Sequence, residues 1–143
     1  MKIYRRSQSI VKAYHGTCEG LYKLILEDDG LRNPYLTRDI DIAKYYANEA
    51  SINYKCGKPI ILEVSIPNIS NLRYDKNSMD EPVFYTKENV QAAWDKAEQD
   101  HPEWVKDDII YIPSSEWEIS WNAVGAVLYN GVIPSEYTKV VVN

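Results

Sequence analysis

Runs of β-branched and aromatic side chains predict the strands of this chain. Residues 10–17 are β-favouring up to the sequence His-Gly-Thr, so we expect a strand that stops in a turn at the glycine. Residues 60–66 are nearly all apolar and lie between two prolines, which favours a strand inside a sheet. Two shorter strands are expected, at residues 109–112 and 138–142.

Apolar residues that recur every three or four positions predict three helices, at residues 19–29, 40–54 and 86–100. We expect Gly30 to cap the end of the first helix, because glycine readily adopts the left-handed conformation found there. Thr37 or Asp39 is expected to cap the start of the second helix.

Polar segments separate these elements. Residues 31–36 are expected to form a loop, and the polar, turn-rich residues 68–82 a surface excursion. Asn130-Gly131 lies between two hydrophobic runs, a pattern typical of a β-hairpin turn.

Residues 114–121 alternate between polar and apolar side chains, which predicts a strand. Because successive side chains of a strand point to opposite faces, Glu116 and Glu118 would share one face, and Trp117 and Trp121 the other. The tryptophans would then pack inward, and the two carboxylates would face a cleft or water.

The length indicates a single domain covering residues 1–143, and we expect it to be a compact α+β domain. The net charge is −5 and no basic stripe is visible beyond residues 2–6, so charge gives a nucleic-acid partner no support. The chain has 12 Tyr and 4 Trp but only 1 Phe, and aromatic rings with a polar group suit a ligand cleft or a partner surface.

The two cysteines, Cys18 and Cys56, form neither a metal-ligand pair nor a disulfide framework. We therefore expect both to be reduced, in a cytoplasmic protein. The chain has no stretch of 18 apolar residues and its start lacks the apolar run of a signal peptide, so no membrane contact is expected.

Candidate chemistry begins at His15-Gly16-Thr17. A glycine at a strand end lets a ligand approach the bare backbone, and the neighbouring imidazole and hydroxyl supply hydrogen-bonding groups.

Three separated motifs resemble, in order, those of the ADP-ribosyltransferase superfamily, in its H-Y-E branch of diphtheria-toxin-like enzymes and poly(ADP-ribose) polymerases. They are Tyr14-His15-Gly16-Thr17, then Tyr35-Leu36-Thr37 leading to Ala43 and Tyr46, then Glu116-Trp117-Glu118. The resemblance touches most of the chain, although its motifs are short. It implies two small, mostly antiparallel sheets around an NAD cleft, with flanking helices.

The resemblance also implies roles for individual residues, with NAD as the substrate. His15 would hydrogen-bond a ribose hydroxyl, and the Gly16 backbone would hold the nicotinamide carboxamide, with Thr17 nearby. Tyr35 would stack on the nicotinamide ring and Tyr46 would flank its other side. Nicotinamide is a flat cation in NAD, which aromatic faces attract.

The catalytic glutamate is ambiguous, with Glu118 favoured over Glu116. A carboxylate would stabilise the positive charge that develops as nicotinamide leaves. Glu116-Trp117 resembles the glutamate–aromatic pair of the H-Y-E enzymes. Glu116-Trp117-Glu118 also resembles the Glu-x-Glu signature of arginine-modifying relatives, in which the second glutamate is catalytic, but those relatives carry an arginine where this chain has His15.

The expected function is mono-ADP-ribosyl transfer from NAD to an unidentified acceptor, without a metal. Because the chain is acidic, a protein acceptor is favoured over a nucleic acid. Three alternatives remain open. The first is an NAD glycohydrolase, with water as the acceptor. The second is a non-catalytic domain of the same fold that binds a nucleotide or partner, and the third is a relative that processes RNA 2′-phosphates. The last requires additional basic residues that the sequence does not visibly supply.

Overall fold

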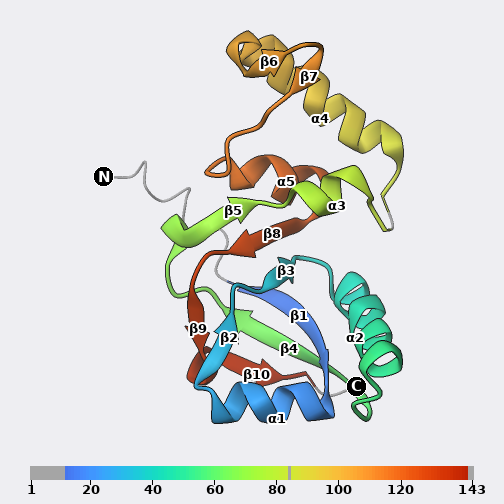
Figure 1. The fold of residues 1–143 in the computed structure, drawn as a ribbon, viewed down its shortest axis with the longest axis vertical. Coiled ribbons are helices and arrows are strands. Elements are labelled where there is room, and N and C mark those ends of the chain that lie inside the picture. The colour runs from blue at the N-terminus through green and yellow to red at the C-terminus, as the bar shows by residue number, and fades with distance from the viewer. Residues whose placement is uncertain (1–11, 84, 142–143) are drawn as a thin grey trace.

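The computed structural model describes residues 12–83 and 85–141, in which antiparallel strands and helices alternate (Figure 1). The strands are β1 Lys12–Cys18, β2 Gly30–Arg32, β3 Tyr35–Thr37, β4 Pro59–Ser65, β5 Leu72–Tyr74, β6 Val105–Lys106, β7 Ile109–Ile110, β8 Ala126–Tyr129, β9 Val132–Pro134 and β10 Thr138–Val140. The α-helices are α1 Glu19–Glu27, α2 Ile40–Tyr54, α3 Lys76–Asp80, α4 Lys87–Asp100 and α5 Trp117–Val124. Short 3-10 helices are η2 Ile69–Asn71, η3 Pro102–Trp104 and η4 Ser135–Tyr137. The expected mixed α+β class with antiparallel sheets is confirmed.

The main sheet has six strands in the order β10-β4-β1-β3-β8-β5. β1 pairs with β4 along all seven of its residues, but it meets β3 at a single pair, Tyr14 opposite Thr37. The sheet therefore divides between β1 and β3 into two three-stranded halves. Two further two-stranded sheets, β2-β9 and β6-β7, complete the described strands.

Apolar side chains from both halves of the main sheet form the principal core. Its buried members are Ala13, Leu31, Leu36, Leu62, Val64, Leu72, Val127, Tyr129 and Ile133. A second cluster joins the β5 and β8 half to α3, α4 and α5 through Tyr74, Met79, Val90, Val124 and Ala126. Each fully buried side chain of the size of Leu or Val contributes about 1.5–3 kcal/mol. The second cluster thus fixes α3, α4 and α5 against the sheet, and a third, formed by Ala43, Ala47 and Ile61, fixes α2.

The longest predicted elements are confirmed. α2 covers residues 40–54, and its N-cap is Asp39, whose carboxylate accepts the Asp41 N–H at 3.0 Å. α4 starts after its N-cap Thr86 and ends at Asp100, and β4 begins one residue before the expected strand. The final strand is confirmed over residues 138–140. Residues 2–6 and 10–11 and position 142 lie outside the described residues.

Several local predictions near the N-terminus are wrong. His15, Gly16 and Thr17 do not form a turn, because β1 continues through them to Cys18 on the ladder with β4. Gly30 does not cap α1, which ends at Glu27. It begins β2 instead, and the left-handed position falls on Asp29 (φ 67°).

The expected loops also contain sheet. Residues 31–36 carry most of β2 and the start of β3, and residues 68–82 include the edge strand β5 and the helix α3. Asn130-Gly131 does not join a hairpin, since β8 pairs with β3 and β5 whereas β9 pairs with β2. These strands have three or four residues each, too few to show a period of two, and their partners are distant in sequence.

Residues 114–121 are not a strand, because α5 starts at Trp117 and ends at Val124, followed by the C-cap Gly125 with φ 70°. The spacing also fits a helix, with Trp117, Ser120, Trp121 and Val124 at helical intervals. Ser120 and Val124 are buried, so the structure uses the helical period. The strand expected at residues 109–112 is shortened to β7, Ile109–Ile110.

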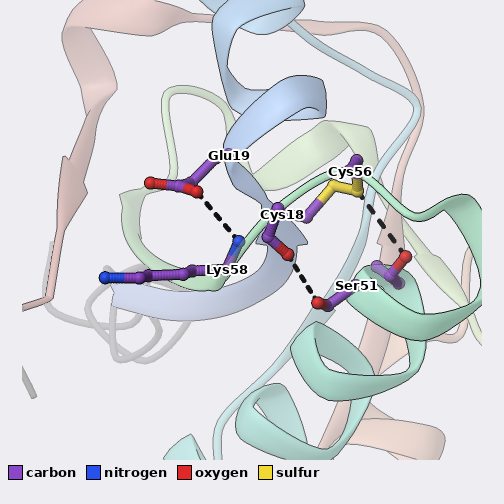
Figure 2. Close-up of a disulfide and its surroundings, with 7 residues drawn as sticks. Cys18, Glu19, Ser51, Cys56 and Lys58 are labelled. Carbon is purple, nitrogen blue, oxygen red and sulfur yellow. Dashed lines mark hydrogen bonds between the residues drawn. A yellow bond between two sulfur atoms is a disulfide. The ribbon is translucent and has the colours of Figure 1, made fainter.

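The expectation of two reduced cysteines is wrong, because Cys18 and Cys56 form a disulfide with their Cα atoms 5.8 Å apart (Figure 2). Pairing of β1 with β4 sets Cys18 opposite Pro59, which brings the end of β1 beside the segment that follows α2. Next to the disulfide, the Glu19 carboxylate accepts the Lys58 N–H at 2.9 Å.

None of the helices in the described part of the chain combines the length and apolar character that crossing a membrane requires. The cytoplasmic location stays a prediction.

Candidate functional site

A cleft of about 470 Å³ lies where the main sheet divides between β1 and β3. Its lining comes from β1, β3, α2, α3, residues 81–83 and 85, and the junction of α5 with β8. This volume falls within the range of roughly 300–1,000 Å³ that small-molecule sites occupy.

His15 lines the cleft from β1. Its Nδ1 lies 2.9 Å from the Tyr35 carbonyl oxygen. Because a carbonyl only accepts, Nδ1 carries the hydrogen and Nε2 keeps a lone pair. Burial lowers the pKa of His15 below its usual 6.5, and the bond to Tyr35 opposes this only in part. The ring therefore offers the cleft a hydrogen-bond acceptor.

Gly16 also lines the cleft, but its lack of a side chain serves packing. A Cβ at this position would fall on the Ala43 carbonyl oxygen and the Ala47 amide nitrogen of α2. Glycine thus allows α2 to lie directly on β1, which brings α2 side chains next to His15. Thr17 is only 2% exposed and is absent from the cleft lining, whereas Thr37 is part of it.

Tyr35 and Tyr46 reach the cleft from β3 and α2, and they are 51% and 40% exposed. The Tyr35 hydroxyl accepts a hydrogen bond from Asn77 Nδ2 at 3.1 Å. Burial raises the pKa of Tyr46, with the nearby charge of Asp75 adding to the rise and a hydrogen bond with Ser78 opposing it. Successive α3 residues thus hold the hydroxyl groups of both aromatic rings.

Glu116 and Glu118 do not lie with these residues. Glu116 is the N-cap of α5, Glu118 is in its first turn, and both line a separate hollow of about 510 Å³ between α4 and α5. The predicted strand is the helix α5, and the start of this helix faces the hollow beside α4. The structure therefore does not bring either carboxylate into the lining of the His15 cleft.

Two other carboxylates line the cleft, and sequence reasoning missed both. Asp75 is 1% exposed and accepts hydrogen bonds from the N–H and the hydroxyl of Ser78, at 3.0 and 2.8 Å. Burial raises the pKa of Asp75, and these two bonds oppose the rise. Glu81, at the end of α3, is exposed. The only local signal was an aspartate three residues before a serine, a helix N-cap pattern inside an expected loop.

Within the described residues, no group of three or more His, Cys, Asp or Glu side chains is placed to hold a metal ion. Comparison of the chain with protein-family models, with curated proteins and with solved structures gave no match. The chemistry of the cleft is therefore the basis for assigning a function.

Proposed function

We propose that the cleft binds NAD and that the chain transfers ADP-ribose from NAD to a macromolecular acceptor, with release of nicotinamide. The observation that carries this proposal is that His15, Gly16, Tyr35 and Tyr46, which come from three different elements, line one cleft. The sequence resemblance assigns to these four residues the contacts with the nicotinamide nucleoside.

The chemistry of the cleft suits that ligand. The Nε2 lone pair of His15 accepts a hydrogen bond from a ribose hydroxyl. The faces of Tyr35 and Tyr46 hold the flat nicotinamide cation, a contact worth about 0.5–2 kcal/mol per ring. A hydrogen bond from Asn77 on α3 holds the Tyr35 hydroxyl, so this side chain loses less freedom when the ligand binds.

The proposed reaction breaks the bond between the ribose C1′ and the nicotinamide nitrogen, and the bonding electrons leave with nicotinamide. A nucleophilic atom of the acceptor forms the new bond to C1′ with its own electron pair and releases its proton to solvent. Positive charge develops on the ribose and requires a nearby carboxylate. We assign this role to Glu81, because it lines the cleft and is exposed, whereas Ser78 engages both oxygens of Asp75. Glu116 and Glu118, which line the other hollow, are assigned no part in this step.

One alternative has a specific observation in its favour. A domain that binds NAD or a related nucleotide without turnover is favoured by the position of Glu116 and Glu118 outside the cleft. An NAD glycohydrolase uses the same site with water as the acceptor, and only the products separate it from a transferase.

The test is nicotinamide release from NAD by the purified protein, alone and with cell lysate, with NAD labelled in the adenosine part. We expect release that lysate increases and label on protein. Tyr35→Leu is expected to lower release at least about tenfold, and its matched control Tyr111→Leu, an exposed tyrosine outside the cleft, to leave it unchanged.

The glutamate assignment is tested in the same assay. Glu81→Gln is expected to lower release by about a hundredfold or more, in the range found when one stabilising group is removed. Glu118→Gln and Glu116→Gln should release nicotinamide as the wild type does. Loss of release in either variant would assign the stabilisation of the ribose charge to that glutamate instead of Glu81. Binding of NAD with no release under any condition would establish the non-catalytic domain, and release without label the hydrolase.

A further inference from the structure

We infer that the cleft recognises the cationic nicotinamide nucleoside by itself and leaves the pyrophosphate of NAD outside. This inference rests on the proposed function, because it concerns the ligand of the same cleft. Its consequence is that nicotinamide riboside is sufficient for binding and that ADP-ribose, which lacks the cation, binds poorly.

The charge of the lining carries the inference. Among the described residues that line the cleft, the acidic side chains are Asp75 and Glu81, and no lysine or arginine is present. Burial lowers the pKa of His15, which disfavours a positive charge on this ring. A pyrophosphate placed here would meet carboxylates and no lysine or arginine from the described lining, whereas phosphate groups in proteins are held by arginine, lysine or exposed backbone N–H groups.

The helix N-termini beside the cleft, which would be the other source of anion binding, are already occupied. At the start of α2 the Asp39 carboxylate accepts the Asp41 N–H at 3.0 Å. At the start of α3 the Asp75 carboxylate accepts the Ser78 N–H at 3.0 Å. An aspartate therefore takes the place at each terminus that a phosphate would need.

Arg38 follows the cleft residue Thr37 in sequence, but its side chain is engaged elsewhere. Its guanidinium donates to the Trp121 carbonyl at 2.9 Å and lies 5.7 Å from the centre of the Trp121 ring. These contacts hold the guanidinium against α5, so it does not supply the missing positive charge.

Aromatic side chains add to the selection for a cation. Five tyrosines line the cleft, namely Tyr14, Tyr35, Tyr46, Tyr54 and Tyr85. The negative face of an aromatic ring attracts a cation, and a carboxylate nearby strengthens the preference. The oxidised nicotinamide ring is flat and positive, whereas the reduced ring is neutral. We expect the cleft to discriminate between the two by at least about tenfold.

The experiment measures the affinity of the full chain for four probes by calorimetric titration: NAD, nicotinamide riboside, reduced nicotinamide riboside and ADP-ribose. We expect nicotinamide riboside to bind within about tenfold of NAD, and the reduced riboside and ADP-ribose to bind at least tenfold more weakly than nicotinamide riboside. Glu81→Gln should weaken the binding of nicotinamide riboside and leave the affinity for ADP-ribose unchanged or slightly higher. Its control Glu98→Gln, on α4, should change neither.

Affinity for ADP-ribose equal to that for NAD, or equal affinity for both redox forms of the riboside, would overturn the inference. Failure of the proposed reaction is separable from this result. If nicotinamide riboside binds selectively but NAD is not cleaved, the reaction is refuted and the inference holds. If NAD is cleaved and ADP-ribose binds as tightly as NAD, the reaction holds and the inference is refuted. No binding of any probe refutes both.

Discussion

The Cys18–Cys56 disulfide joins two residues separated by 38 positions in the sequence. The loop that it closes contains α1, β2, β3 and α2. Both cleft tyrosines, Tyr35 and Tyr46, lie inside this loop. In the chain-entropy model, a cross-link over a loop of this length stabilises the folded state by about 4 kcal/mol. Domains are stable by about 5–15 kcal/mol in total, so reduction should remove a large fraction of the free energy of unfolding.

The assay is urea unfolding followed by tryptophan fluorescence, with and without reductant. With a slope of about 2 kcal/mol per molar urea, a loss of about 4 kcal/mol lowers the midpoint by about 2 M. The control is the double variant Cys18→Ala with Cys56→Ala, which should unfold near the midpoint of the reduced protein and be insensitive to reductant. The reasoning is refuted if the wild-type protein, with two free thiols demonstrated by titration, keeps the midpoint of the oxidised protein.

Three further predictions concern the cleft. Gly16→Ala should cost about 1–3 kcal/mol of unfolding free energy in urea, because its Cβ meets the α2 backbone, and unchanged stability would contradict this close packing. Burial raises the pKa of Asp75, so its ionisation opposes folding as the pH rises through the folded-state pKa. The melting temperature of Asp75→Asn minus that of the wild type should therefore increase as the pH rises from about 4 to 8. A decrease of this difference over the same range would show that the folded state lowers the pKa of Asp75. His15 should titrate in NMR spectra with a midpoint below 6.5, since burial lowers its pKa, and a midpoint above that value would place a charged ring in the cleft.

Local sequence signals were sufficient for the long elements. α2 and α4 have 15 and 14 residues, enough for several turns of apolar periodicity, and each starts at a side chain suited to capping. β4 falls in a nearly continuous apolar run between Pro59 and Pro67. The sequence motifs also named His15, Gly16, Thr17, Tyr35 and Tyr46 as a group, and the structure places all of these except the buried Thr17 on one cleft.

Only the tertiary structure decided which carboxylates accompany that group. Residues 114–121 fit a strand and a helix almost equally well, and burial of Ser120 and Val124 against neighbouring elements selects the helix. That choice leaves Glu116 and Glu118 beside α4. The edge strand β5, too short to show a pattern, pairs with β8 and so delivers Asp75 and α3 to the cleft.

The sequence by itself therefore determined the long helices and the strand β4, because these features depend on residues close together in the chain. Four of the cleft residues were named by motifs that resemble those of a known family. The short strands, the Cys18–Cys56 disulfide and the acidic character of the cleft were decided by tertiary structure. Each of these depends on contacts between segments far apart in the chain. Such contacts produce no hydrophobic periodicity within either segment, so neither segment alone predicts them.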